Sequence, residues 1–270
     1  MSAVSFGARL HEVAARLGPL CVGIDPHPSL LERWGLADDV RGLESFALGA
    51  VDALAGTVGV LKPQSAFFER HGSAGVAVLE RTIAAARDAG ALVLLDVKRG
   101  DIGSTAQAYA DAYLDPASPL CADAVTVSPF LGFGSVQPFL ATAERHGGGV
   151  LVLALTSNPE GPEVQHARVE DGRTVAGVVV DHVRAANAGA DPLGSVGLVV
   201  GATVGSTGED LSVNGPILVP GLGAQGGTAA DLERIFDGVD ALVVPTTSRA
   251  VLEAGPDPVA LRDAAARALD

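Results

Sequence analysis

The segment DVKRGDI, residues 96–102, places two carboxylates and two cations directly after the apolar run 91–95. A run that is apolar throughout and then becomes charged is typical of a buried parallel strand that ends at the mouth of an α/β fold. Because side chains alternate along an extended chain, Asp96 and Lys98 are predicted to point to one side, with Asp101 a short loop away. Carboxylates around a lysine favour its protonated form. The spacing therefore predicts a proton donor, and the alternative is a surface salt-bridge cluster of little energetic value.

The composition limits the class of protein. The chain has 270 residues, 48% of them hydrophobic, which is enough for a large core in one domain, residues 1–270. Its 18 Lys and Arg against 32 Asp and Glu give a formal net charge of −14, so the phosphates of nucleic acid or of an anionic membrane would be repelled. No apolar segment approaches the roughly 18 residues of a membrane span, and the N-terminal stretch has no long apolar region of the kind found in a signal peptide. We therefore expect a cytoplasmic protein with a small-molecule partner.

Eight short apolar runs alternate with segments of helical periodicity. The runs cover residues 20–24, 57–61, 91–95, 124–127, 150–155, 196–200, 217–219 and 241–244. The helical segments cover residues 75–89, 134–146, 175–188, 229–236 and 258–269. This alternation predicts right-handed strand–helix–strand units and a parallel sheet, and eight units predict a (β/α)8 barrel. The irregular stretch 157–173 is interpreted as a lid rather than a tolerated insertion. The cysteines, Cys21 and Cys121, lie in or beside apolar runs and are expected to be buried free thiols.

Polar residues follow most of these runs. In a barrel the C-terminal ends of all strands converge on one mouth, where active sites form. The residues that would meet there are Asp25, Lys62, Asp96, Lys98, Asp101, Ser128, Ser157 and Arg249. Any one of them could be a solvated strand end, but their convergence predicts a functional site.

The glycine-rich stretch PGLGAQGG, residues 220–227, follows the seventh run. It matches the dinucleotide pattern GxGxxG, but that pattern is expected in the unit that opens a doubly wound sheet, with an acidic residue about 20 positions later. Loops after strands seven and eight of a barrel commonly bind phosphate through backbone N–H groups. Gln225 and Arg249 would add side-chain donors. The stretch is therefore predicted to bind phosphate, with a simple turn as the alternative.

These features together resemble the orotidine 5'-monophosphate decarboxylase family over nearly the whole chain. DVKRGDIGST at 96–105 is similar to the family's DxKxxD signature, and VGIDP at 22–26 and LKPQSAFFE at 61–69 are similar to its longer bacterial branch. The signature core is shared with a wider superfamily of phosphosugar enzymes, whereas its combination with KPQSAFFE, Gln225 and Arg249 is specific. The resemblance implies conversion of orotidine 5'-monophosphate to uridine 5'-monophosphate and CO2, the last step of de novo pyrimidine synthesis, without a cofactor.

The resemblance also implies residue roles. Asp25 and Lys62 would bind ribose hydroxyls, with Lys62 also paired to Asp96. Asp96 would face the substrate carboxylate, and Lys98 would protonate C6 of the pyrimidine. Asp101 and Thr105 would reach across a homodimer interface into the neighbouring site. The remaining substrate contacts would be Ser157 at the pyrimidine, and Pro220, Gln225, Gly226 and Arg249 around the phosphate.

Loss of CO2 from C6 leaves a carbanion with little resonance stabilisation, so the developing charge must be met electrostatically. The six histidines are scattered and no motif suggests a metal, pyridoxal phosphate or thiamine, which leaves the Lys98 ammonium as the candidate. Asp96 beside the substrate carboxylate would cost roughly 4 kcal/mol at 4 Å and an effective dielectric of 20, which disfavours the ground state.

Two other functions remain open. The first is a Mg2+-dependent phosphosugar enzyme of the same superfamily, of the keto-gulonate phosphate decarboxylase or hexulose phosphate synthase type, which shares DxKxxD. The second is a non-catalytic barrel that binds a nucleotide, although such a module has no need for Asp96 and Asp101 to crowd a bound anion.

Overall fold

Eight parallel strands form a closed barrel in the computed structural model, which describes residues 4–205, 207–223 and 226–269. The strands pair in chain order, and β8 pairs with β1 to close the ring. They are β1 (Cys21–Ile24), β2 (Val60–Pro63), β3 (Leu92–Arg99), β4 (Ala124–Val127), β5 (Gly149–Leu155), β6 (Val196–Val200), β7 (Pro216–Pro220) and β8 (Leu242–Thr247). The (β/α)8 barrel predicted from the alternating runs is therefore confirmed.

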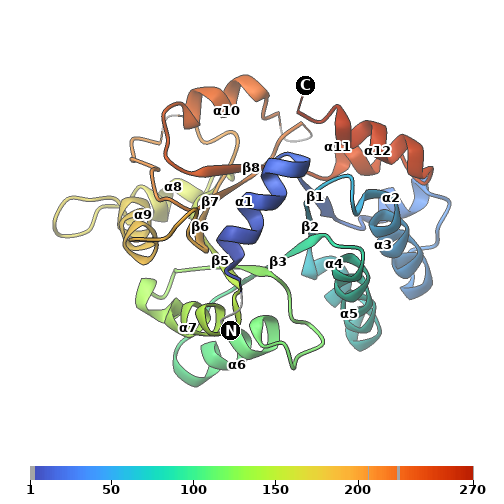
Figure 1. The fold of residues 1–270 in the computed structure, drawn as a ribbon, viewed down its shortest axis with the longest axis horizontal. Helices are drawn as coiled ribbons and strands as arrows, with labels where there is room; N and C mark the ends of the chain where they lie inside the picture. The colour runs from blue at the N-terminus through green and yellow to red at the C-terminus, as the bar shows by residue number, and fades with distance from the viewer. Residues whose placement is uncertain (1–3, 206, 224–225, 270) are drawn as a thin grey trace.

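Helices surround the strands (Figure 1). They are α1 (Phe6–Leu17), α2 (Pro28–Arg33), α3 (Val40–Leu54), α4 (Ser65–Glu69), α5 (Gly72–Asp88), α6 (Gly103–Leu114), the 3-10 turn η1 (Phe133–Val136), α7 (Gln137–His146), α8 (Gly161–Gln165), α9 (Val175–Ala186), α10 (Ala229–Phe236), α11 (Arg249–Leu252) and α12 (Pro258–Ala266). The described residues between β6 and β7 contain no helix. None of the described helices is long and apolar enough to cross a membrane.

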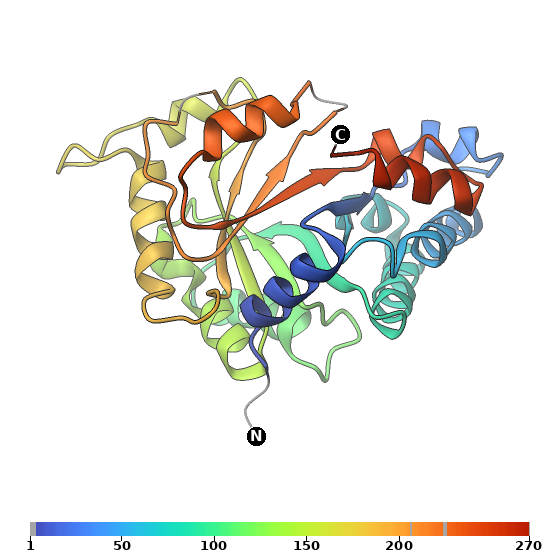
Figure 2. The same ribbon diagram turned by 45° about the horizontal axis from the view of Figure 1, so that its top comes forward.

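Helix α1 lies across the N-terminal end of the barrel (Figures 1 and 2). Phe6 and Leu10 of this helix pack in one apolar cluster with inward-facing strand residues such as Cys21, Val60 and Leu151. Gly7 lets helix α1 pack closely against the backbone at Leu193, because a Cβ on Gly7 would lie 2.2 Å from the carbonyl oxygen of Leu193. A second and larger cluster fills the space between the strands and the outer helices. Burial on both faces explains why the strands are apolar without alternation.

The strand ends differ from those predicted. Strand β2 begins at Val60, because the N–H groups of Thr57 and Val58 both donate to the carbonyl of Leu54 in the turn after α3. Strands β3 and β8 continue beyond the predicted apolar runs, to Arg99 and Thr247. Hydrogen bonds to neighbouring strands are available there, so a polar side chain does not end the strand. Polar residues expected after the strands therefore lie within them.

The helices and cysteines match their predictions more closely. Residues 229–236 form α10 as predicted, while the segment predicted as 258–269 ends as a helix at Ala266. The predicted helix 134–146 is divided into η1 and α7, and the irregular stretch 157–173 contains the short helix α8. Cys21 and Cys121 are buried free thiols, as expected. Burial raises the pKa of the Cys21 thiol to about 12, which keeps it protonated and unreactive.

Candidate active site

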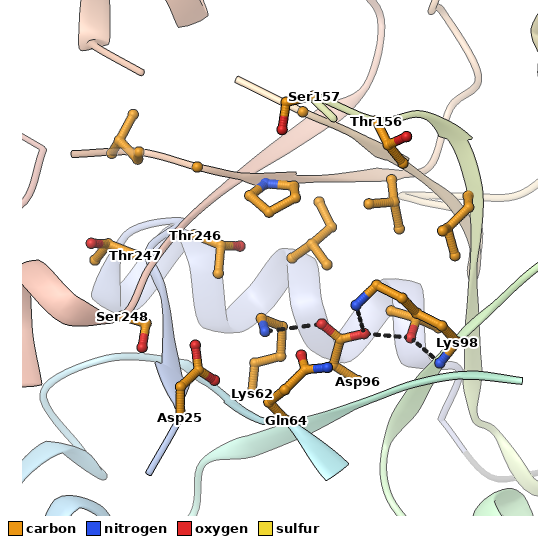
Figure 3. A pocket seen from close by; sticks show the side chains of 18 of the residues that line it. Asp25, Lys62, Gln64, Asp96, Lys98, Thr156, Ser157, Thr246, Thr247 and Ser248 are labelled. Carbon is orange, nitrogen blue, oxygen red and sulfur yellow. Dashed lines mark hydrogen bonds and ion pairs between the residues drawn. The ribbon is translucent and has the colours of Figure 1, made fainter. Parts of the chain in front are cut away.

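The C-terminal ends of the strands enclose a cavity of about 480 Å³. Its lining includes charged or polar residues from β2, β3 and β8 and from the loops that follow β1 and β5 (Figure 3). The charged groups in it are three cations, Lys62, Lys98 and Arg249, and two carboxylates, Asp25 and Asp96. The cavity therefore carries an excess of positive charge in a chain whose formal net charge is −14. Such a local excess favours a small anionic ligand.

Asp96 lies between two lysine ammonium groups (Figure 3). Lys62 Nζ donates to Asp96 Oδ2 at 3.1 Å, and Lys98 Nζ donates to Asp96 Oδ1 at 2.6 Å. The side chains of Lys62 and Asp96 are 6% and 8% exposed, whereas that of Lys98 is 44% exposed and faces the cavity. Lys98 is therefore the most exposed member of this group.

The environment keeps this group charged. Burial by itself raises the pKa of Asp96, but the charges of Lys62 and Lys98 and hydrogen bonds from Lys98 and Thr126 outweigh it and lower the pKa to about 2. Burial lowers the pKa of Lys62, but attraction to Asp96 and Asp25 is stronger, and the net effect is a raised pKa. Asp96 is therefore a carboxylate, and Lys62 an ammonium, at neutral pH.

Strand β3 is irregular at the residues that carry these charges. The register with β4 shifts between Leu95 and Arg99, and Lys98 has a φ of +45°, a conformation that residues other than glycine rarely adopt. Thr126 of β4 is hydrogen-bonded to this irregular stretch through its side chain. The bulge turns Lys98 out of the regular strand geometry, while its ammonium remains beside Asp96.

Unpaired polar atoms gather on another wall of the cavity. Among the described residues, four buried side-chain polar atoms have no hydrogen-bond partner. Three of the four belong to residues that line the cavity, Asp25, Thr247 and Ser248. A buried polar atom without a partner is costly, so these atoms are suited to bind a polar ligand or water. Arg249, the next residue, is exposed at the start of α11 and makes no ion pair within the described part of the chain.

The loop after β5 is held by its own side chains. Gln165 of α8 accepts a hydrogen bond from the N–H of Thr156 at 2.9 Å and donates to its Oγ1 at 2.6 Å. A Cβ added to Gly201, after β6, would lie 3.0 Å from Cβ of Ser157, so a larger residue there would push Ser157 away. Ser157 thus lies close to Gly201 at the rim of the cavity.

The structure brings most of the predicted site residues into one cavity. Those that line it are Asp25, Lys62, Asp96, Lys98, Ser157, Pro220 and Arg249. Asp101, Thr105 and Gly226 are not part of the lining. Gln225 lies outside the residues that the structure describes.

The expectation that Asp101 flanks Lys98 within one chain is not met. The Asp101 carboxylate instead accepts a hydrogen bond from the N–H of Ile102 at 2.7 Å, and it makes no ion pair with a described residue of its own chain. Asp101 is thus absent from the lining of the cavity, while Asp96 and Lys98 are part of it.

Several lining residues were missed by the sequence reasoning, namely His27, Gln64, Thr126 and Gln165. Thr126 was missed because it lies inside the apolar run 124–127, where its only signal is a polar residue among apolar ones. Thr247 and Ser248 belong to the polar segment predicted at the end of the eighth strand, and the structure adds that their hydroxyls are unpaired. Within residues 4–205, 207–223 and 226–269, no group of three or more His, Cys, Asp or Glu side chains is placed to hold a metal ion.

Comparison with known proteins gives one family. Residues 18–264 match the model of the orotidine 5'-phosphate decarboxylase / HUMPS family. A protein from Salinispora tropica named orotidine 5'-phosphate decarboxylase is 68% identical over 266 residues, which are 98% of this chain and 96% of that protein. One of the same name from a Nocardioides species is 66% identical over 270 residues, 99% of this chain and 98% of that one.

A solved structure agrees with these relatives. The crystal structure of a Streptomyces avermitilis protein, provisionally named orotidine 5'-phosphate decarboxylase, superposes with a TM-score of 0.97 at 59% identity and covers 100% of this chain and 95% of its own. The resemblance inferred from DVKRGDIGST and KPQSAFFE is thereby confirmed. The chain therefore belongs to the orotidine 5'-phosphate decarboxylase / HUMPS family.

Proposed function

We propose that this protein decarboxylates orotidine 5'-monophosphate to uridine 5'-monophosphate and CO2. The observation that carries the proposal is the arrangement of Lys62, Asp96 and Lys98 at the cavity, with a buried carboxylate between two ammonium groups, of which that of Lys98 is the more exposed. The names of relatives that are 60–68% identical over nearly their full length support the same reaction. The family model also covers HUMPS enzymes, so these relatives favour the decarboxylase within the family.

The distribution of charge supports an orientation for the nucleotide. Arg249 and the hydroxyls of Thr247 and Ser248 lie together in sequence at the end of β8, which suits the phosphate and the sugar. Asp25 and Lys62 would bind the ribose hydroxyls. The pyrimidine would then lie between Lys98 and Ser157, with Pro220 at the phosphate end. Gln225 and Gly226 of the glycine-rich stretch are proposed to complete the phosphate site.

The reaction needs one bond to break and one to form. When the bond from C6 to the carboxylate carbon breaks, its electron pair stays on C6 and CO2 leaves. The Lys98 ammonium meets the developing charge and transfers a proton from Nζ to C6. Asp96, ionised because its pKa is about 2, holds the ammonium by a 2.6 Å hydrogen bond and faces the carboxylate that is lost. The proposed charges of the group therefore fit both binding and proton transfer.

Phosphate binding far from C6 can also lower the barrier. Contacts between the phosphate and Arg249 stabilise a closed arrangement of the surrounding loops, which excludes water and orients the pyrimidine against Lys98. The loop after β5, held by Gln165, would close over the base and act as the lid inferred from residues 157–173.

The protein is further proposed to act as a homodimer in which Asp101 and Thr105 contact the site of the partner subunit. Exposed apolar side chains support this arrangement, since Ile102 is 63% and Phe130 is 74% exposed. Their loops touch, because a Cβ on Gly100 would lie 2.6 Å from the carbonyl oxygen of Ser128. A patch of this kind next to a catalytic mouth is suited to pair with a second copy.

A decarboxylation assay tests the proposed function. Purified protein is incubated with orotidine 5'-monophosphate in EDTA, and the loss of substrate is followed by its ultraviolet absorbance, with Lys98→Ala as the background control. Rapid formation of uridine 5'-monophosphate without added metal is expected. Failure to convert the nucleotide, with activity on a sugar phosphate that requires Mg2+, would instead assign the chain to the phosphosugar enzymes. Tight nucleotide binding without any turnover would indicate the non-catalytic barrel.

A further inference from the structure

Thr126 of β4 is almost fully buried and uses every hydrogen-bonding position of its hydroxyl. Its Oγ1 accepts from the backbone N–H of Val97 at 3.1 Å and from that of Lys98 at 3.0 Å. The same oxygen donates its proton to Asp96 Oδ1 at 2.8 Å. A hydroxyl has one donor and two acceptor positions, so these three contacts saturate it.

These contacts lie where the β3–β4 ladder is interrupted. The register runs from Leu95 opposite Val125 directly to Arg99 opposite Val127, so the residues of the bulge have no backbone partner on β4. The side chain of Thr126 takes the place of the missing carbonyl acceptor for two consecutive N–H groups. Without it, two buried donors would lack a partner, which is costly inside a protein.

The bulge is also the place where backbone strain is found. Lys98 has a φ of +45°, which costs free energy for a residue with a side chain and persists only where surrounding contacts hold it. The Thr126 hydroxyl contacts the N–H of that same residue and the carboxylate that holds its ammonium. One side chain therefore fixes both ends of Lys98, its backbone through the N–H and its Nζ through Asp96.

We propose that Thr126 is a positioning residue for the decarboxylation, which fixes the β3 bulge so that the Lys98 ammonium is aimed at the reacting carbon. The proposal rests on the proposed function of the site. Thr126 acts through Asp96 and the backbone of Lys98. Because a displacement of about 1 Å at a catalytic group can cost roughly 100-fold in rate, loss of this hydroxyl should affect turnover more than binding.

The alternative hypothesis is that Thr126 contributes only packing to the barrel core. Valine has nearly the same shape, packs well in strands and has no hydroxyl to satisfy. If Thr126 only fills space, Thr126→Val would leave turnover unchanged and Thr126→Ser, which removes a methyl group, would be the more harmful change. The proposal expects the reverse order for these two variants.

The test compares Thr126→Val and Thr126→Ser with Thr82→Val as the matched control. Thr82 is also a fully buried threonine, and its Oγ1 donates to the Val78 carbonyl at 2.8 Å within α5, away from the cavity. We expect kcat of Thr126→Val to fall roughly 10- to 100-fold, while KM and the affinity for uridine 5'-monophosphate stay within about threefold. Thr126→Ser and Thr82→Val should keep kcat within about threefold of the wild type.

Two kinetic results would overturn the proposal. Thr126→Val with wild-type kcat would show that the hydroxyl is not needed, and an equal loss of kcat in Thr126→Ser would show that packing, not hydrogen bonding, is responsible. Amide hydrogen exchange at Val97 and Lys98 provides a readout that does not need activity. We expect faster exchange in Thr126→Val than in the wild type or in Thr126→Ser. Unchanged exchange would contradict the proposal that the Thr126 hydroxyl holds these two N–H groups.

The same experiment separates this proposal from the proposed function. A wild-type protein that does not convert orotidine 5'-monophosphate refutes the function, and the exchange at Val97 and Lys98 then decides the role of Thr126 alone. An active wild type with an equally active Thr126→Val variant refutes only the role of Thr126.

Discussion

The two ends of the barrel each contain a buried aspartate between two cations. At the N-terminal end, Asp123 is paired with Arg9 and lies 4.0 Å from Arg87, and at the C-terminal end Asp96 is paired with Lys62 and Lys98. The two aspartates are almost equally buried, at 5% and 6% exposed.

The partners of the two carboxylates differ in what else they can contact. Asp123 also accepts the backbone N–H of Val93 at 2.9 Å, and Arg9 donates its second contact to the carbonyl of Gly147 under helix α1. At the other end, Lys98 faces a cavity that has the unpaired atoms of Asp25 and Ser248 on another wall. Each aspartate thus has one exposed cation beside it, since the side chains of Arg87 and Lys98 are 46% and 44% exposed. The difference is that Lys98 lines the cavity at the C-terminal ends of the strands and Arg87 does not.

The largest difference between the two ends of the barrel is expected in the turnover of Lys98→Ala. Loss of a general acid costs roughly 100- to 10,000-fold in rate, so kcat should fall by that factor while uridine 5'-monophosphate still binds. The matched change at the other end, Arg9→Met, should lower the free energy of unfolding, because Asp123 loses its closest cation, and leave kcat unchanged. Steady-state kinetics, nucleotide titration and chemical unfolding of both variants test this. Wild-type turnover in Lys98→Ala would remove this residue from the chemistry.

A smaller effect is expected from Arg249→Ala. Removal of a charge-assisted contact to the phosphate should lower kcat/KM roughly 10- to 100-fold without changing the unfolding midpoint, because Arg249 is exposed. Arg81→Ala is the control, since Arg81 is a surface arginine that pairs with Glu44 at 2.7 Å on the outer helices. If kcat/KM is unchanged in Arg249→Ala, the phosphate does not bind at the end of β8.

Acid should lower the free energy of unfolding by protonating Asp96 at the C-terminal end of the barrel. The pKa of this carboxyl is lowered from 3.8 to about 2 in the folded protein, so its stabilising contribution is present above pH 4 and is lost as the pH falls toward 2. The difference in unfolding free energy between the wild type and Asp96→Asn should therefore shrink by roughly 2 kcal/mol between pH 5 and pH 2. Urea unfolding at several pH values measures it. A difference that does not change with pH would contradict the ion-paired state of Asp96.

The smallest effect concerns the proposed dimer. Lys98→Ala and Asp101→Ala are each expected to be nearly inactive, but mixed dimers would contain one site with both native residues. Equal mixing should therefore restore about one quarter of the wild-type activity, as expected for random pairing in a two-fold dimer. Activity after mixing and re-equilibration is compared with that of each variant alone. No recovery, although the two variants exchange subunits, would place Asp101 in the site of its own chain.

Local patterns in the sequence were enough for the strands and for the main charged residues. The runs 124–127 and 196–200 match β4 and β6, and the alternation of strands and helices predicted the barrel. Such patterns can be recognised in a sequence because a buried strand is itself composed of apolar residues. The C-terminal ends of β2, β3 and β8 were not predicted, since they depend on pairing with other strands.

The sequence by itself determined the eight-strand barrel, the charged segment DVKRGDI and the family. Only the tertiary structure decided how the charges are used. Lys62 and Asp96 are 34 positions apart, and Asp96 and Thr126 are 30 apart, yet each pair is hydrogen-bonded. Those contacts depend on the register of β2 and β4 against β3 and on the bulge at Lys98, which no local pattern encodes. Tertiary structure therefore paired Lys98 with Asp96 and joined the Thr126 hydroxyl to both residues.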